Sequence, residues 1–265
     1  MDLRKYKLSP ADLAEAKASL FYQPFGISEE IQSGIAYDWI YNKGVLQVDR
    51  REVDAETWKT FDALNHNLRT TYDGWLDAIA ARYGDLRNAS VLDIACAEGY
   101  FLHGLKQRGA GRCIGYDIAT RPSVSTGLLN RLLGHDVEFR NVAYDMRLHT
   151  LPGAEPADIV ISSAIMGHLS DPTFFLEFLG SITKRLLFIY SAFEDTDVFR
   201  VTYEGPREHH DAKAKFPLCF SGRTMVSTSL FHFAMNELGF TRVIEALQLV
   251  RLPPEPYRAY IAIKD

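Results

Sequence analysis

The distribution of apolar and polar positions divides the chain into two parts. In the first part, apolar residues recur at helical spacing over residues 10–21 and 54–84, with Asp54 as the expected N-cap of the second helix. Residues 22–41 between them are rich in aromatic side chains and are interrupted by glycine and proline, so no regular element is expected there. The pattern predicts an N-terminal helical and aromatic cap over residues 1–84.

In the second part, short apolar runs alternate with helical patterns. The runs predict strands over residues 90–96, 112–118, 137–144, 157–165 and 185–193. The helical patterns lie between them, over residues 100–109, 122–134 and 171–183. Strands that alternate with helices form a parallel sheet with right-handed crossovers, and continuous apolar strands are buried on both faces.

The end of the chain has a different pattern. Residues 222–240 predict a helix, and residues 241–252 and 257–265 predict two strands joined by the turn-forming sequence PPEP. We therefore expect residues 85–265 to form one Rossmann-like α/β domain. Its sheet should be doubly wound and mostly parallel, with a reversed C-terminal strand.

Composition and charge narrow the class of protein. The 265 residues are 47% hydrophobic and 24% charged, which allows a large core and shows no signature of disorder. The formal charge of −5 argues against a nucleic-acid partner. No signal segment and no run of about 18 apolar residues is visible, so no membrane association is expected. The cysteines Cys96, Cys113 and Cys219 have no metal-binding spacing, so we expect no metal site and a reducing, cytoplasmic location.

The sequence DIACAEG follows the first strand of the predicted sheet and is the best candidate for a ligand site. In an open α/β sheet, ligands bind beyond the carboxyl ends of the strands. Asp93 ends the first strand, and Ala95, Cys96 and Gly99 keep side-chain bulk low, so that the backbone can approach a ligand. Asp117 ends the second strand, at a spacing where an acid commonly meets ribose hydroxyls. Both acids could instead be structural, one in a turn and one at a helix cap.

The charge of this loop indicates which ligand it accepts. A dinucleotide site uses the pattern G-x-G-x-x-G, in which glycines allow the pyrophosphate onto the helix N-terminus. Here the loop is A-C-A-E-G, and Glu98 would place a negative charge where the pyrophosphate should lie. An acidic loop suits a cationic ligand, and S-adenosylmethionine has a sulfonium, an ammonium and no phosphate.

Five segments in order resemble the motifs of class I S-adenosylmethionine-dependent methyltransferases. They are VLDIACAEGYF, GYDI, VEFRNVAYDM, ADIVISSAIMGHLSDP and RLLFIYSAF. The first motif usually has glycine where Ala95 and Ala97 stand. The resemblance covers about residues 85–265. The segments CAEGYF, QRGAGRCIGYDI and MGHLSDP are also similar to the branch that contains tRNA wobble-uridine modification enzymes and small-molecule relatives.

The resemblance implies roles for particular residues. Asp117 would accept the ribose hydroxyls, with Ile118 beside it in the second motif. Val142 and Ala143 of the third motif would border the adenine, and Ser162 lies in the fourth motif. Asp93 would organise the loop and meet the methionine ammonium, while Cys96 would contribute its backbone alone.

Three further positions are candidates that also have structural explanations. Arg69, on the helix before the first strand, could pair with the methionine carboxylate or lie on a solvated helix face. His168 follows the fourth strand and could accept a proton from a hydroxyl as the methyl group arrives, or bond to the loop structurally. In the sequence REHHDAK, the residues His209, His210 and Asp211 could bind a divalent metal, but a polar loop is the simpler explanation, and His210 could still act as a base. The aromatic stretch of the cap could be a lid over the acceptor or an apolar cover on the sheet.

These observations predict a methyltransferase that uses S-adenosylmethionine and releases S-adenosylhomocysteine. The expected acceptor is a small molecule, sugar-like or aromatic, methylated at oxygen by in-line displacement, with His168 or His210 as base. A tRNA-modifying methyl or carboxymethyl transferase, a nicotinamide oxidoreductase and a non-catalytic cofactor-binding module remain alternatives. A homodimer and a carboxylated cofactor also stay open.

Overall fold

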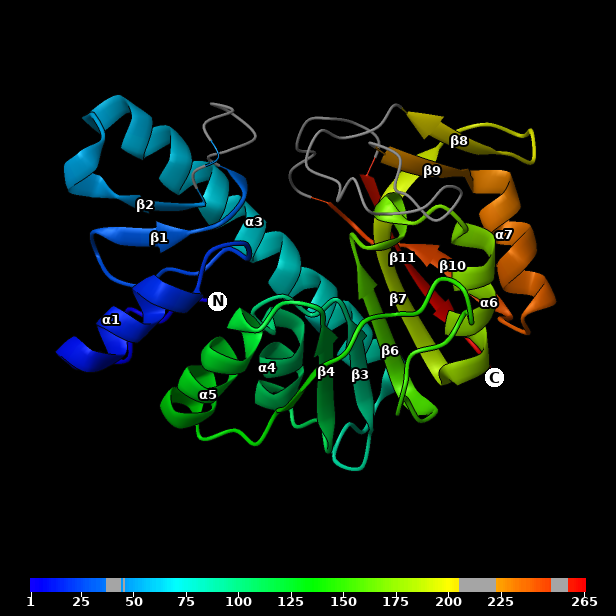
Figure 1. Cartoon of the computed structure of the whole chain (residues 1–265), viewed down its shortest axis with the longest axis horizontal. Helices are drawn as coiled ribbons and strands as arrows, with labels where there is room; N and C mark the ends of the chain where they lie inside the picture. Colours follow the sequence, from blue (N-terminus) through cyan, green and yellow to red (C-terminus); the bar gives the residue numbers. More distant parts are fainter. Residues whose placement is uncertain (37–43, 45, 205–222, 249–256) are drawn as a thin grey trace.

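The centre of the molecule is a twisted sheet of mostly parallel strands (Figure 1). The computed structural model describes residues 1–36, 44, 46–204, 223–248 and 257–265. Seven strands follow in the spatial order β10 (Arg242–Glu245), β11 (Tyr257–Ile263), β7 (Thr183–Glu194), β6 (Ala157–Ser163), β3 (Val91–Ile94), β4 (Cys113–Asp117) and β5 (Glu138–Asn141). Strands β3 to β7 are parallel, whereas β11 runs antiparallel to both of its neighbours. The strand order reverses between β3 and β6, so a ligand crevice is expected there.

Helices cover both faces of this sheet, as the predicted alternation requires. They are α4 (Tyr100–Gln107), α5 (Arg121–Leu133), α6 (Pro172–Ile182) and α7 (Thr228–Glu237). Alternate residues of a strand point to the two opposite faces of the sheet. Val91 packs with Phe101 of α4 in the apolar core on one face, and Leu92 packs with Phe175 of α6 in the core on the other. The Rossmann-like fold class is therefore confirmed. In the described part of the chain, no helix combines the length and the apolar character needed to cross a bilayer.

Residues 223–227 differ from the prediction. The sequence suggests one helix over residues 222–240, but the structure has strand β9 (Arg223–Ser227) before α7 begins. Strand β9 pairs with β8 (Val201–Glu204) and with the end of β7. The helix starts after Ser227 because its hydroxyl accepts the amide of Leu230, which is an N-cap that the apolar pattern hides. The predicted PPEP turn lies outside the described residues.

The residues before β3 form the N-terminal part of the molecule. Its elements are α1 (Pro10–Ser19), β1 (Ile31–Ser33), β2 (Gln47–Asp49), η1 (Arg50–Glu52) and α3 (Ala55–Tyr83). Asp54 accepts the amide of Thr57 and caps α3, as predicted. The antiparallel pair β1–β2 lies in and just after the stretch where no regular element was expected. Its partners are 14 to 18 residues apart, which a local pattern does not reveal.

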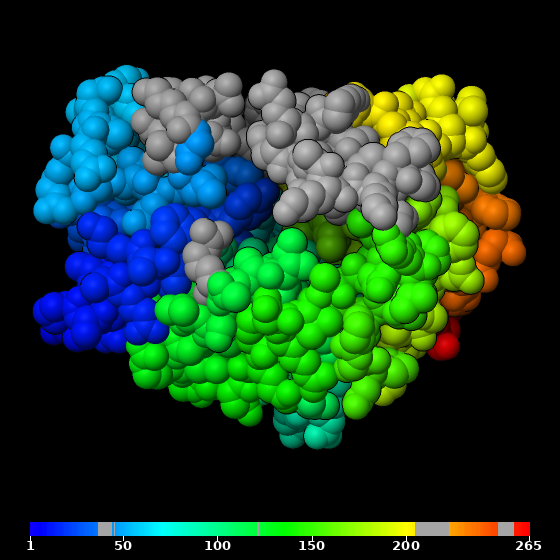
Figure 2. Space-filling model, in the orientation of Figure 1, coloured from blue at the N-terminus to red at the C-terminus, as the bar shows by residue number. Residues whose placement is uncertain are grey.

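Two of the places where the N-terminal part contacts the sheet domain involve its helices. Trp75 of α3 lies in the apolar core, with its ring 5.4 Å from that of Phe188 on β7. At the other place α1 packs on α5, where Arg131 pairs with Glu15 at 2.5 Å. The space-filling view accordingly shows a continuous surface from the blue N-terminal residues to the green residues of α5 (Figure 2).

Close contacts between β4 and the loop and helix that follow β3 require glycine at position 115. A Cβ added to Gly115 on β4 would lie 2.6 Å from Sγ of Cys96 and 2.8 Å from Cδ1 of Leu102. Glycine at this position therefore allows the loop after β3 to lie directly on β4. We expect Gly115→Ala to lower the free energy of unfolding by roughly 1–3 kcal/mol, because the core is overpacked.

Urea unfolding of paired variants would test this expectation. Cys96→Ala removes the sulfur and should recover part of the loss in the double variant. Gly127→Ala on α5 is the matched control, since its added Cβ meets nothing closer than 4.0 Å and should stabilise the helix by about 0.5–1 kcal/mol. Equal stability of the Gly115→Ala variant and the wild type would contradict the close approach.

Candidate functional site

A cavity of about 650 Å³ opens at the carboxyl ends of β3, β4 and β6, at the reversal of strand order. This volume lies within the range of roughly 300–1,000 Å³ that small-molecule sites occupy. Most of the lining is apolar, and its side chains come from four loops and from the N-terminal part. The lining includes Tyr22, Ala95, Ala97, Glu98, Asp117, Ile118, Val142, Ala143, Ser163, Ile165, His168 and Leu169.

The loop after β3 forms the floor of this cavity in an unusual backbone conformation. Ala95, Ala97 and Gly99 have φ values of 61°, 47° and 82°, all in the left-handed region. Glycine adopts this region freely, whereas alanine there costs about 1–2 kcal/mol. The two alanines stand where the motif that the sequence resembles usually has glycine, and both adopt the left-handed conformation that glycine would adopt freely.

Asp117 connects the ends of β3 and β4. Its Oδ2 accepts the amide of Ala97 at 3.0 Å, and its Oδ1 accepts the amide of Ala119 at 2.9 Å. Each carboxylate oxygen has a further lone pair, and the half-buried side chain lines the cavity. Asp117 can therefore hold the loop and accept hydroxyl groups of a ligand at the same time.

Asp93 is a buried acid beneath this loop. Its side chain is 0% exposed, and neither carboxylate oxygen has a hydrogen-bond partner among the described residues. Burial, and secondarily the nearby charge of Asp117, raises the pKa of Asp93 well above its usual range. A buried acid of this kind is stabilised in its charged form by a cation, so the site fits a ligand with an ammonium group.

Glu98 has a different role from the one its charge suggests. Its carboxylate is 1% exposed and accepts the backbone amides of Phe21, Tyr22 and Gln23 at 3.2, 3.0 and 3.0 Å. These three hydrogen bonds satisfy much of the negative charge inside the protein. Glu98 does belong to the cavity lining, but the three amides engage its carboxylate, so the expectation that it contributes a free charge to the ligand site is corrected.

The structure brings most of the predicted ligand residues to this one cavity. Six of them line it: Ala95, Asp117, Ile118, Val142, Ala143 and His168. Gly99 and Asp93 are not among the lining residues: Gly99 precedes the first turn of α4, and Asp93 is buried one residue before the lining residue Ile94. His210 lies outside the described residues.

Cys96 and Ser162 do not line the cavity with their side chains. The Cys96 thiol is buried over Gly115, and burial raises its pKa well above the usual range, so it is no nucleophile. Its carbonyl accepts the side-chain amide of Gln23. Ser162 is fully buried and lacks a described partner, whereas Ser163 lines the cavity. Consecutive strand residues point to opposite faces, and the motif does not show which serine faces the ligand.

Arg69 is not among the residues that line the cavity. Its guanidinium donates to Oε1 of Gln32 at 2.8 Å inside the N-terminal part, and burial lowers its pKa. The alternative reading, a solvated helix face, is also wrong, because the side chain is 5% exposed. The predicted contact with a ligand carboxylate is therefore corrected.

Several lining residues were not predicted. Tyr22 reaches the cavity from the N-terminal part, and Ile165 and Leu169 reach it from the segment around η2 (Met166–His168). The only signal for them was their position, since Tyr22 stands in the aromatic stretch and the other two flank His168 in the fourth motif. Within the described residues, no group of three or more His, Cys, Asp or Glu side chains is arranged to hold a metal.

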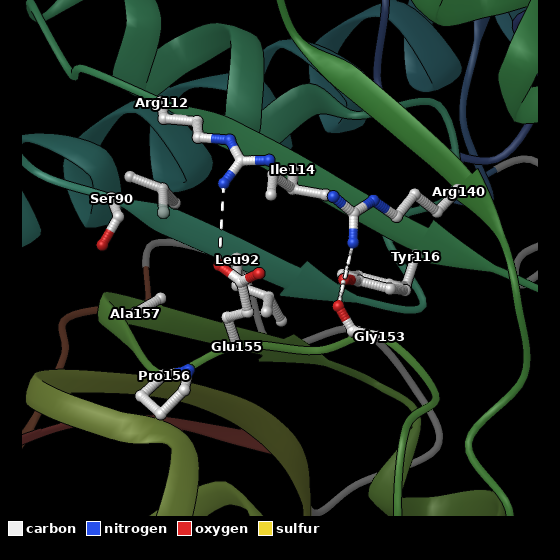
Figure 3. A pocket seen from close by; sticks show the side chains of 11 residues that line it. Ser90, Leu92, Arg112, Ile114, Tyr116, Arg140, Gly153, Glu155, Pro156 and Ala157 are labelled. Atoms are coloured by element: carbon white, nitrogen blue, oxygen red, sulfur yellow. Dashed lines mark hydrogen bonds and ion pairs between the residues drawn. The ribbon is translucent and has the colours of Figure 1, made fainter.

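A second, much smaller cavity of about 40 Å³ lies against the face of β3 and β4 (Figure 3). Arg140 donates to the carbonyl of Gly153 at 2.9 Å and to the hydroxyl of Tyr116, and Arg112 pairs with Glu155 at 3.8 Å. These contacts fasten the segment before β6 to the sheet. This segment belongs to the connection between β5 and β6, which begins with Val142 of the main cavity lining. The cluster therefore supports the wall of the main cavity.

Comparison with known proteins agrees with this geometry. A family model described as a methyltransferase domain matches residues 64–220, which is more than half of the chain. A tRNA U34 carboxymethyltransferase from Campylobacter hominis is 28% identical over 142 residues, covering 53% of this chain and 44% of that protein. One from Vibrio vulnificus is 28% identical over 96 residues, covering 36% and 29%. The chain thus spans less than half the length of these curated relatives.

Solved structures show the same fold. The N-terminal domain of EvdMO1 with S-adenosylhomocysteine has a TM-score of 0.55 at 13% identity, covering 73% of this chain and 81% of that one. Magnesium protoporphyrin IX methyltransferase from Synechocystis has a TM-score of 0.53 at 17% identity, covering 76% and 87%. Together with the matched family model, the strand order and the loop after β3, these comparisons show that the chain belongs to the class I S-adenosylmethionine-dependent methyltransferases.

Proposed function

We propose that this protein transfers a methyl group from S-adenosylmethionine to a small, uncharged acceptor at a hydroxyl oxygen. The observation that carries this proposal is the buried carboxylate of Asp93, which has no described partner and lies one residue before Ile94 of the cavity lining, to which Asp117 also belongs. A cationic ligand would compensate both acids, and a pyrophosphate would be repelled by them.

In this proposal the cofactor would lie along the cavity. Asp93 would stabilise the methionine ammonium, Asp117 would accept the ribose hydroxyls, and Val142 and Ala143 would border the adenine. When bound, the cofactor supplies a methyl group already activated by the sulfonium. The protein then has to align the acceptor and exclude water.

The acceptor would occupy the side of the cavity near η2. Ile165 and Leu169 give this side an apolar surface, Tyr22 borders it from the N-terminal part, and His168 is the one imidazole in the described lining. We assign His168 the role of accepting the proton of the acceptor hydroxyl. Residues 1–84 would then act as a cap that walls the acceptor site.

The described lining contains no lysine or arginine. An acceptor or cofactor with an additional carboxylate would therefore meet acids and apolar groups there, without a described cation to pair with. This favours S-adenosylmethionine over a carboxylated variant, and a neutral acceptor over an acidic one.

A second candidate function is modification of tRNA, because the curated relatives are named as tRNA U34 carboxymethyltransferases. The charge of the chain is the observation against it. Residues 1–84 contain thirteen acidic and ten basic residues, so the proposed cap has no net positive charge for a phosphate backbone.

Cofactor binding is the first test. Calorimetry should show micromolar affinity for S-adenosylmethionine and S-adenosylhomocysteine and no binding of NADH. Asp117→Ala should weaken binding by about 1.5–3 kcal/mol for each hydrogen bond to the charged carboxylate that is lost. Asp158→Ala is the matched control. Asp158 also accepts a backbone amide, that of Ser90, but it lies at the N-terminal end of β6, away from the cavity at the carboxyl ends of the strands. Equal losses in the two variants would remove Asp117 from the site.

The stability of an Asp93→Asn variant should depend on pH in a defined direction. The pKa of Asp93 is higher in the folded state than its unfolded value of about 3.8. Above pH 3.8 the folded protein therefore binds more protons than the unfolded chain, and the free energy of unfolding of the wild type falls as pH rises. The variant carries no such acid, and its stability relative to the wild type should therefore increase from pH 4 to pH 8. Denaturant unfolding at both pH values would measure this, and calorimetry should show weaker cofactor binding by the same variant.

The acceptor class can be tested by measuring release of S-adenosylhomocysteine. We expect turnover with neutral phenols or sugars and none with unmodified tRNA. We also expect no salt-dependent binding of tRNA between about 50 and 200 mM salt. Over this range, a protein with about six phosphate contacts would change its affinity for tRNA roughly a thousandfold. Methyl or carboxymethyl transfer to tRNA would support the second candidate. Cofactor binding without turnover on any acceptor would indicate a non-catalytic module.

A further inference from the structure

The N-terminal part makes direct contact with the backbone of the cofactor loop through one buried side chain. Gln23 is 6% exposed. Its Oε1 accepts the amide of Tyr100, the first residue of α4, at 2.9 Å, and its Nε2 donates to the carbonyl of Cys96 at 3.3 Å. One amide group thus spans the loop between the end of β3 and the start of α4.

This contact replaces a cap that the helix itself does not provide. The N-cap residue of α4 is Gly99, which has no side chain to accept one of the free amides of the first turn. Gln23, 77 residues away in the sequence, supplies that acceptor. The amides of Cys96 and Ala97 donate to the carbonyl of Tyr116 and the carboxylate of Asp117 on β4, so the loop is held from two sides.

The backbone of the same segment is fixed by Glu98. The carboxylate accepts three consecutive amides, from Phe21 to Gln23, and so holds Tyr22 at the edge of the cavity. Loop and segment therefore each provide acceptors for the other's amides. Neither can move without leaving buried polar groups without partners, which costs roughly 1–3 kcal/mol for each group.

We propose that Gln23 is a positioning residue of the cofactor site: it holds residues 95–99 in the conformation that receives the methionine end, while Glu98 holds residues 21–23 as a fixed wall. This inference rests on the proposed function, since it concerns the same cofactor. It implies that cofactor binding stabilises the conformation of residues 21–23, and that this conformation in turn strengthens cofactor binding, because coupling between two sites is reciprocal.

Two isosteric substitutions separate positioning from general stability. Gln23→Met keeps the volume and removes both contacts with the loop. Gln32→Met is the matched control, because Gln32 is 1% exposed and bonds to Asp62, Asn65 and Arg69 within the N-terminal part. Both variants should lower the melting temperature. Only Gln23→Met should raise the Kd and KM for S-adenosylmethionine, by roughly tenfold, with kcat within about twofold of the wild type.

Amide hydrogen exchange on the wild-type protein provides a test that needs no variant. S-adenosylmethionine should slow exchange at the amides of Phe21, Tyr22 and Gln23, which bond to Glu98 and would touch the cofactor at most through the side chain of Tyr22. Unchanged exchange there, or equal Kd values for the two methionine variants and the wild type, would overturn the inference while leaving the proposed function intact. A wild-type protein that does not bind S-adenosylmethionine would overturn both.

Discussion

The buried carboxylate of Glu98 is the interaction on which the arrangement of the site depends. Moving a carboxylate out of water costs several kcal/mol unless hydrogen bonds replace its hydration. Three consecutive backbone amides provide that replacement, and they belong to a segment about 75 residues earlier in the chain. The loop after β3 can therefore be buried only together with residues 21–23. The N-terminal part is thus a structural component of the site and not an appendage to the sheet domain.

This arrangement changes how the charge of the loop is understood. Read from the sequence, Asp93, Glu98 and Asp117 form one acidic rim that attracts a cation. In the structure Glu98 is satisfied internally and Asp117 is partly engaged, while Asp93 alone has no described partner. A cationic ligand still fits the site, because the buried carboxylate of Asp93 and the half-buried carboxylate of Asp117 remain to interact with it. Burial also explains why the pKa of Asp93 is raised, and why a ligand ammonium would favour its ionised form.

The sequence predicted the parts of the fold that local patterns encode. Continuous apolar strands and helical spacing identified the parallel sheet, and the acids at the ends of two strands identified the side where the cavity lies. What it could not supply were contacts between distant segments. Glu98 reads as a free charge until its three amide donors are located, and Arg69 reads as a ligand contact until Gln32 is found beside it. Strand β9 was hidden because the sequence TMVS is as apolar as the helix that follows it.

The two alanines of the loop suggest why this member of the family departs from its motif. Ala95 and Ala97 both line the cavity and both adopt left-handed backbone conformations that glycine would adopt without strain. Each position costs about 1–2 kcal/mol of backbone strain, and each alanine contributes to the lining of the cavity. The surrounding contacts from Gln23, Glu98 and Asp117 hold the loop in this conformation. A loop fixed in this way can carry non-glycine residues because its shape is set by partners outside it, and the cavity gains apolar surface where a glycine loop would expose backbone.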